Sequence, residues 1–393
     1  MKIKRISENK LLSLLKQFPA VGVIGPRQCG KTTMALTVQK QLKRDSVYFD
    51  LESPADFRKF NDPEFFLNQQ QDLNIIIDEV QRIPELFAVL RSVIDKKKKS
   101  GRFMLLGSAS PELVKGSSES LAGRIYYIEA HPFNLIELPN KSTTMQKHWF
   151  RGGFPDAYLA KNDSEHFNWL DGFARTFIER DLNTLFGQSF SPQVMFRLWR
   201  MLAHHHSGIW NAQSFSKGLD ISPTTVNRYL DYLEGAFMVR KLMPFHHNTK
   251  KRLVKSPKVY IRDSGLLHYL LDIHHSKTLK YHSSVGHSWE GYVIEQILEL
   301  LPRTIQPYYY RTHDGSEMDL VLVKGIKPIA CIEIKYSSSP TISRGMSESL
   351  NDLKCKNNFI ITPNDDAPYQ LSKNLVISGL ERFLTKHLPI LLK

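Results

Sequence analysis

The chain has 393 residues, which is enough for two or three domains with cores of their own. Its 41% hydrophobic content is ordinary, and no run reaches the roughly 18 apolar residues of a membrane helix, so no membrane partner is expected. The N-terminus is basic, but its apolar run at 11–15 is broken by Lys16 and Gln17 and is too short for a signal peptide. Three cysteines argue against a disulfide framework, and we expect a cytoplasmic protein.

The formal net charge of +14 predicts an anionic partner, and nucleic acid is the obvious one. Charge alone is a weak argument. The lysine run 96–99 is better interpreted as a solvated helix end than as a DNA contact.

Residues 25–32, GPRQCGKT, follow the apolar run 21–24 and precede a helix-like segment at 33–38. This pattern in this context predicts a phosphate-binding loop, because glycines let backbone N–H groups point at phosphate oxygens. Lys31 can reach the β- and γ-phosphates of ATP, and Thr32 can offer its hydroxyl to Mg²⁺. The residues expected to bind nucleotide are Gly25, Pro26, Arg27, Gln28, Cys29, Gly30, Lys31, Thr32, Thr33 and Ser108.

Residues 18–135 alternate apolar strands with amphipathic helices, which predicts an α/β parallel sheet. The expected third strand, 74–77, runs into Asp78 and Glu79, which places both carboxylates at the edge where ligands bind. We expect Asp78 to hold Mg²⁺ together with Thr32, and Glu79 to orient the attacking water as a catalytic base beside Lys31.

Two further residues leave alternatives open. Ser108 ends a strand at 102–108 and either senses the γ-phosphate or makes a strand-end turn. Arg124, before a last strand at 125–128, is either a catalytic contact to the γ-phosphate of its own or a neighbouring subunit's nucleotide, or a surface arginine.

Four segments, 25–33, 77–81, 106–109 and 121–124, together resemble a family of prokaryotic AAA+-type ATPases with a C-terminal domain of unknown function. Segments 151–155, 177–182 and 262–267 extend the resemblance over nearly the whole chain. It implies ATP binding and hydrolysis. Cys29 stands where the family usually has a small aliphatic residue, which should not prevent binding since this position contributes backbone.

Residues 211–219 and 223–233 read as two helices joined by a short turn, with Ser222 as cap and Pro223 in first position. A strand at 237–242 completes the pattern of a winged helix-turn-helix. The second helix would present Thr224, Thr225, Asn227 and Arg228 to the DNA major groove, although many winged helices bind protein instead. Histidines at 204–206, 246–247 and 274–275 are consecutive, so their side chains diverge, and packed or solvated histidines are favoured over a metal site.

In the C-terminal part, a helix at 287–298 precedes strands at 307–312, 317–323 and 329–335. Asp319, Glu333 and Lys335 form the pattern D-x(13)-E-x-K, and Glu290 can approach from the helix. Three carboxylates beside one lysine suit Mg²⁺ or Mn²⁺. The pattern resembles the PD-(D/E)xK nuclease superfamily, with Met318 in place of the proline. An ion-paired sheet face is the alternative.

These observations predict a P-loop NTPase parallel sheet with helices on both faces, then a helical and winged-helix segment and a C-terminal α/β restriction-endonuclease-like domain. The expected domains are 1–138 (ATPase), 139–190 (helical lid or connector), 191–279 (winged helix) and 280–393 (nuclease-like). The predicted function is an ATPase that acts on DNA. Alternatives are a nucleotide-dependent switch or scaffold that binds DNA or protein without cleavage, and an ATP-gated Mg²⁺-dependent nuclease; a homo-oligomer is possible.

Overall fold

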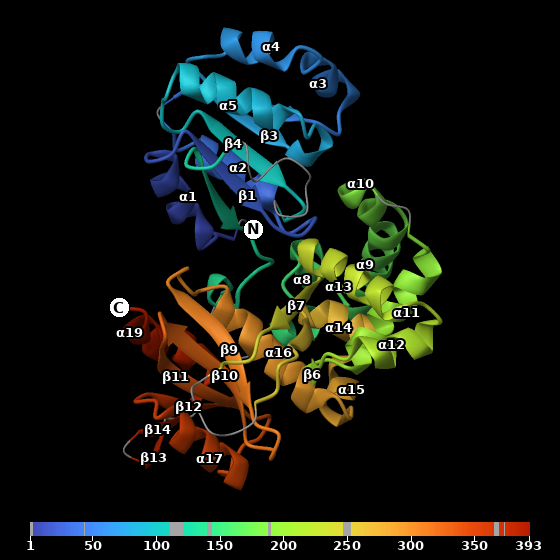
Figure 1. The fold of residues 1–393 in the computed structure, drawn as a ribbon, viewed down its shortest axis with the longest axis vertical. Helices are drawn as coiled ribbons and strands as arrows, with labels where there is room; N and C mark the ends of the chain where they lie inside the picture. The colour runs from blue at the N-terminus through green and yellow to red at the C-terminus, as the bar shows by residue number, and fades with distance from the viewer. Residues whose placement is uncertain are drawn as a thin grey trace. The chain divides into compact units, whose positions relative to one another are not determined.

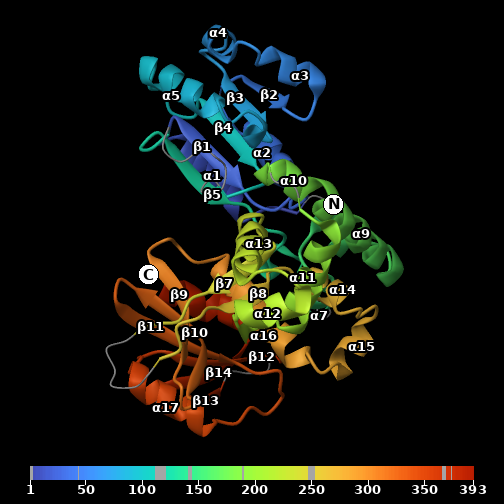
Figure 2. The same cartoon turned by 45° about the vertical axis from the view of Figure 1, so that its right-hand side comes forward.

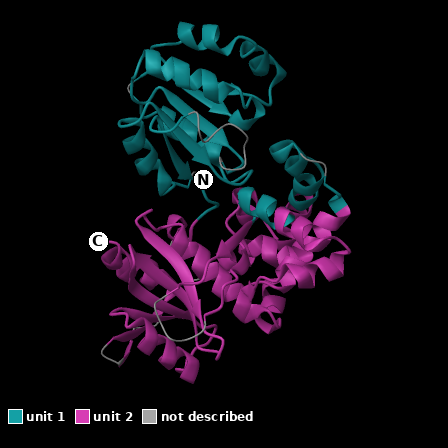
Figure 3. Ribbon diagram, in the orientation of Figure 1, with its two compact units in different colours: residues 1–133, 173–192, 229–238 teal, residues 134–172, 193–228, 239–393 magenta. Residues whose placement is uncertain are grey.

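The computed structural model describes residues 3–42, 44–110, 121–139, 144–187, 190–246, 253–364, 369–372 and 374–393. The chain divides into two compact units (Figure 3). The first holds residues 1–133, 173–192 and 229–238, and the second holds 134–172, 193–228 and 239–393. His247 of the second histidine pair lies outside the described residues.

The first unit is built on a five-stranded sheet in the order β2-β3-β4-β1-β5 (Figure 1). All of its neighbouring strands pair in parallel, as predicted. The strands are β1 (Ala20–Ile24), β2 (Ser46–Asp50), β3 (Asn74–Asp78), β4 (Phe103–Gly107) and β5 (Ile125–Glu129).

Successive side chains of a strand point to opposite faces of the sheet. Because the strands of this sheet are largely apolar, both of its faces are apolar. Ile75 and Ile77 pack with α4 (Pro63–Gln69) and α5 (Leu86–Lys96), whereas Ile76 packs with α1 (Ser7–Leu15) and α2 (Lys31–Gln39). Figures 1 and 2 let the reader follow these two layers of helices. The short helix α3 (Pro54–Lys59) follows β2. Because all five strands run in parallel, their carboxyl ends lie at one edge of the sheet, where ligands bind.

The first unit also takes in helical segments from later in the chain. These are the end of α9 (Asp163–Thr176), the π-helical turn η3 (Phe177–Asp181), α10 (Leu182–Phe186) and the second half of α13 (Pro223–Gly235). Phe186 and Phe190 pack their rings on Tyr232. The helical character predicted for residues 139–190 is confirmed where the structure describes them, since α7 (Thr144–Arg151) and α8 (Pro155–Leu159) precede α9.

The two helices predicted at 211–219 and 223–233 are present as α12 (Ala212–Leu219) and α13, whereas their assignment to a winged helix stays a prediction. Asn211 accepts a hydrogen bond from the backbone N–H of Gln213 (3.1 Å) at the start of α12. The Ser222 hydroxyl accepts one from the N–H of Thr225 (3.1 Å) at the start of α13. The strand β7 begins at Val239, two residues later than predicted, because Phe237 has a φ of 63° and breaks the extended backbone.

Around these two helices the second unit adds α11 (Pro192–His204), α14 (Ser264–Leu270) and α15 (Ser276–Tyr281). A small antiparallel sheet joins β6 (Gly208–Ile209), β8 (Lys258–Ile261) and β7 (Val239–Leu242), in that order.

The second unit ends in a six-stranded mixed sheet, in the order β13-β14-β12-β11-β10-β9. Its strands are β9 (Ile305–Arg311), β10 (Glu317–Lys324), β11 (Lys327–Ile334), β12 (Asn358–Thr362), β13 (Tyr369–Ser372) and β14 (Leu375–Gly379). Two helices, α16 (Val285–Leu298) and α17 (Arg344–Leu353), contact this sheet, and α18 (Leu380–Arg382), η4 (Phe383–His387) and α19 (Leu388–Leu391) follow it. The strands predicted at 307–312, 317–323 and 329–335 correspond to β9, β10 and β11, and no helix was predicted where α17 lies. Of the described residues, none forms a helix both long and apolar enough to cross a bilayer.

Three histidines of the second unit are packed inside it. His268 bonds the carbonyl of Phe150 (2.8 Å) and the hydroxyl of Ser288 (2.7 Å), and burial lowers its pKa to about 4. Burial also lowers the pKa of His206 to about 3 and that of His166 to about 4. His206 accepts a hydrogen bond from the N–H of Ile261 (3.0 Å). Packing is therefore the role of these histidines.

These depressed pKa values predict a loss of stability in mild acid. An unfolded histidine with a pKa near 6.5 takes up a proton below that pH, whereas the folded one stays neutral until about pH 4. Each such histidine should therefore lower the free energy of unfolding by about 2 kcal/mol between pH 7 and pH 5.

Urea unfolding at the two pH values checks this, followed by tryptophan fluorescence, because all five tryptophans lie in the second unit. A His268→Gln variant, which has no proton to gain, should lose less stability on acidification than the natural chain. An identical loss in both proteins would contradict the prediction.

Candidate functional site

The phosphate loop, residues 25–32, leaves the carboxyl end of β1 and enters α2 as predicted. Its backbone needs glycine at two positions. A Cβ atom at Gly25 would lie 2.0 Å from the carbonyl oxygen of Ala130, and Gly30 has a φ of 95°. Gln28 is also left-handed, with a φ of 58°. This curled backbone is the geometry that turns N–H groups toward an anion.

Lys31 is buried, and its ammonium is bound to the loop itself. Its Nζ donates to the carbonyl oxygens of Gly25 (3.0 Å) and Pro26 (2.8 Å) and to Ser108 Oγ (3.0 Å). The two carbonyls are neutral acceptors, and a phosphate oxygen with a full charge is a stronger one. Lys31 can therefore exchange these partners for a triphosphate.

Ser108, at the end of β4, links the cation to the proposed base. Its hydroxyl accepts from Lys31 and donates to Glu79 Oε1 (2.9 Å). Glu79 follows β3 with a φ of 54°, and the side-chain amide of Gln81 donates to its other oxygen. A strand-end turn alone does not account for Ser108, while its contact with the γ-phosphate stays a prediction.

Thr32 and Asp78, the pair predicted to hold Mg²⁺, lie in direct contact. The Thr32 hydroxyl donates to Asp78 Oδ2 at 2.6 Å, and the Tyr48 hydroxyl donates to the same oxygen at 2.9 Å. Burial raises the pKa of Asp78, an effect that the hydrogen bond from Thr32 opposes. A hydroxyl and a carboxylate are hard oxygen ligands, so the pair fits Mg²⁺.

Arg124 lies far from this group. Its carbonyl accepts from the N–H of Ala20 at the start of β1, whereas the phosphate loop leaves the other end of that strand. Its guanidinium forms a two-point ion pair with Asp95 on α5 (2.7 Å each). The predicted contact of Arg124 with its own chain's nucleotide is therefore contradicted. A contact to a neighbouring subunit's nucleotide stays a prediction.

Three side chains that the sequence analysis did not single out support this site: Arg5 and Asp181 contact the phosphate loop, and Tyr48 contacts Asp78. Arg5 donates to the carbonyl of Cys29 (2.9 Å), whose buried thiol points inward, so position 29 contributes backbone to the loop. Arg27 pairs with Glu52 (2.8 Å) and with Asp181. Asp181 belongs to segment 177–182 of the family resemblance, which was the available signal for it.

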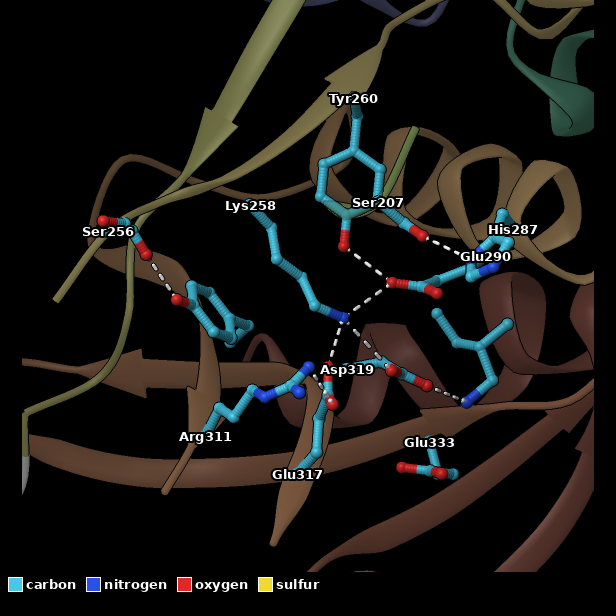
Figure 4. Close-up of polar contacts among 12 residues, drawn as sticks. Ser207, Ser256, Lys258, Tyr260, His287, Glu290, Arg311, Glu317, Asp319 and Glu333 are labelled. Carbon is cyan, nitrogen blue, oxygen red and sulfur yellow. Dashed lines mark hydrogen bonds and ion pairs between the residues drawn. The ribbon is translucent and has the colours of Figure 1, made fainter. Parts of the chain in front are cut away.

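Three of the four residues of the C-terminal pattern, Glu290, Asp319 and Glu333, lie close together at the six-stranded sheet (Figure 4), and Lys335 directly follows β11. Lys335 Nζ lies 2.7 Å from Glu333 Oε1, and the N–H of Ile334 donates to Asp319 Oδ2 at 2.9 Å. The pKa of Asp319 is raised by burial and by the neighbouring carboxylates of Glu333 and Glu290.

A second lysine, which the sequence analysis missed, stands among these carboxylates. Lys258 Nζ, from β8, lies 3.0 Å from Glu290, 2.6 Å from Glu317 and 3.6 Å from Asp319. Within the described ranges, no group of three or more histidine, cysteine or acidic side chains is arranged to hold a metal ion. The predicted metal role of Glu290, Asp319 and Glu333 stays a prediction.

The proposed DNA-reading residues begin α13. Thr224, Asn227 and Arg228 are exposed, and Thr225 is half-buried against Ser222. Asn227 Oδ1 already accepts a hydrogen bond from Trp210 Nε1 (2.8 Å), which leaves its amide N–H₂ for other partners. Their contact with DNA stays a prediction.

Three family models match separate parts of the chain. An AAA domain matches residues 17–138, a domain of unknown function (DUF8612) matches 142–277, and a second one (DUF4143) matches 285–382. The AAA domain contains the phosphate loop and both strand-end acids. The predicted AAA+-type ATPase domain is therefore confirmed at the level of its family, which supports nucleotide binding, whereas the nuclease-like assignment of the C-terminal domain is not supported.

Two curated proteins resemble nearly the whole chain. Uncharacterized proteins of Mycobacterium tuberculosis and Mycobacterium bovis are each 40% identical over 383 residues, covering 97% of this chain and 85% of theirs. Among solved structures, a Walker-type ATPase of Pyrococcus abyssi is 15% identical with a TM-score of 0.45, over 69% of this chain and 96% of its own. AMPPCP-bound DnaA of Aquifex aeolicus is 13% identical with a TM-score of 0.32, over 58% and 85%.

Proposed function

The chain belongs to the same family as the two mycobacterial proteins, and we propose that it is an ATP-hydrolysing AAA+-type protein that acts on DNA. One observation carries the ATPase part: a hydrogen-bonded chain runs from Lys31 through Ser108 to Glu79 at the carboxyl edge of the sheet. It joins the side chain suited to binding phosphate to the side chain suited to orienting water.

In this proposal the phosphate loop binds the β- and γ-phosphates through its N–H groups and Lys31. Thr32 and Asp78 would hold Mg²⁺, which neutralises phosphate charge when bound. Glu79 accepts a hydrogen bond from the attacking water and so orients it. Ser108, which touches both Lys31 and Glu79, positions the base relative to the cation.

The DNA part of the proposal rests on the exposed start of α13 and on the chain's net charge of +14. We propose that the C-terminal domain binds DNA or protein without cleaving it. The ammonium of Lys258 favours this second candidate over an ATP-gated nuclease, because it already neutralises the carboxylates that a metal would need.

ATP turnover measured with and without duplex DNA tests this function. We expect DNA to stimulate turnover, and we expect the stimulation to fade as salt rises, since phosphate contacts release counterions. An Arg228→Ala variant should lose stimulation, whereas Lys324→Ala, which removes the same charge from an exposed strand end, should keep it. Turnover that is indifferent to DNA at low salt would refute the DNA part while leaving the ATPase part standing.

A further inference from the structure

Lys258 is an unusual residue, because a lysine with only 4% of its side chain exposed is buried among acids. It comes from β8, in the stretch matched by one domain of unknown function, and reaches carboxylates in the stretch matched by another. Figure 4 shows its ammonium between Glu290, Glu317 and Asp319. We call Glu290, Glu317, Asp319 and Glu333 the carboxylate cluster.

The carboxylate cluster is almost neutralised by side chains of the chain itself. Lys335 pairs with Glu333 (2.7 Å) and Arg311 with Glu317 (2.9 Å), and Lys258 stands between the remaining two. Four carboxylates therefore face three cations. The Tyr260 hydroxyl adds a hydrogen bond to Glu290 Oε1 (2.7 Å).

Lys258 carries its charge in this setting. Burial alone would lower its pKa, but the carboxylates of Glu290, Asp319 and Glu317 outweigh burial and raise its pKa well above the usual value. A divalent metal needs oxygen ligands at about 2.0–2.6 Å, so it would have to lie next to this ammonium. Two cations at such a short distance repel each other strongly in a site that is shielded from water. The residues present therefore do not fit a metal while Lys258 is in place.

We propose that Lys258 is the resident cation of the carboxylate cluster, occupying the position that a divalent metal would take. The cluster then joins β8 to the C-terminal sheet as an ion network, and it binds Mg²⁺ or Mn²⁺ only after Lys258 is withdrawn. Glu333 Oε2 is buried without a hydrogen-bond partner, but a single oxygen is too few ligands for a metal site of its own.

Mn²⁺ titration of the full nucleotide-free chain, followed by the electron paramagnetic resonance signal of free Mn²⁺, tests this proposal. Each protein is compared with its own Asp319→Asn counterpart, so that only metal bound at the cluster is counted. The natural chain should show no difference from Asp319→Asn. Lys258→Met should bind one additional Mn²⁺, and the Lys258→Met/Asp319→Asn double variant should lose it. Lys324→Met, which removes the same charge from an exposed position, should gain none.

Two results would overturn the proposal: one Mn²⁺ bound by the natural chain and lost in Asp319→Asn, or a folded Lys258→Met chain that gains no metal. If Lys258→Met does not fold, Lys258→Gln keeps a polar end and serves in its place, and the comparison of the natural chain with Asp319→Asn stands by itself. The outcome does not depend on ATP hydrolysis, because nucleotide is absent from the experiment.

Discussion

Replacing Lys31 with alanine is expected to lower ATP turnover by at least about 100-fold, the typical effect of removing one preorganised charge contact to a transition state. In the structure its ammonium donates to two loop carbonyls and to Ser108, and the variant removes this ligand for phosphate. Turnover at saturating ATP and nucleotide affinity by calorimetry give the two readouts. We expect both to fall, because Lys31 contacts the nucleotide before and during the reaction.

A matched control lies at the end of the same helix. Lys40 follows α2 and is exposed, so Lys40→Ala removes the same charge and leaves the phosphate loop intact. This control should keep turnover within a few-fold of the natural chain. ATP hydrolysis that survives in Lys31→Ala would remove the main proposal.

The ATPase fold could be predicted from sequence because its signals are local. The phosphate loop is eight consecutive residues, and the strand before Asp78 is a continuous apolar run that needs no partner to be recognised. Parallel pairing then follows, since helices separate the strands. Carboxyl ends of parallel strands share an edge, so the proximity of Thr32 to Asp78 could be expected before any distance was known.

Arg124 shows where this reasoning fails. The sequence places Arg124 directly before the last strand. The end of the strand that Arg124 flanks determines the edge of the sheet at which it lies. Residues that precede a parallel strand lie at the amino edge, opposite the phosphate loop. Applied to the sequence, this rule favours the surface arginine among the alternatives left open for Arg124.

Lys258 could not have been predicted, because nothing local links it to Asp319, which is 61 positions further along the chain. The strand that carries it reads as apolar and buried, and a lysine at its first residue looks like a solvated strand end. Lys258 is buried because β8 packs against acidic side chains, two of which, Glu290 and Asp319, the sequence predicted as metal ligands. The same holds for Asp181 and Arg27, which are 154 residues apart and meet only in the folded chain.

Glu79→Gln is expected to separate ATP binding from ATP hydrolysis. The amide keeps the size and can still accept from the Ser108 hydroxyl, but it cannot polarise water as a carboxylate does. Turnover should fall by about 100-fold or more, within the range for loss of a general base, while nucleotide affinity stays within a few-fold. Single-turnover kinetics and calorimetry measure the two effects separately.

Glu64→Gln, an equal charge change at a surface ion pair, should alter neither turnover nor affinity. If Glu79→Gln hydrolyses ATP normally, another residue must orient the water. If it binds no ATP, Glu79 supports the loop instead. Only a loss of turnover with retained ATP binding assigns Glu79 the role of the base. It would then be the last member of the hydrogen-bonded series that runs from Lys31 through Ser108.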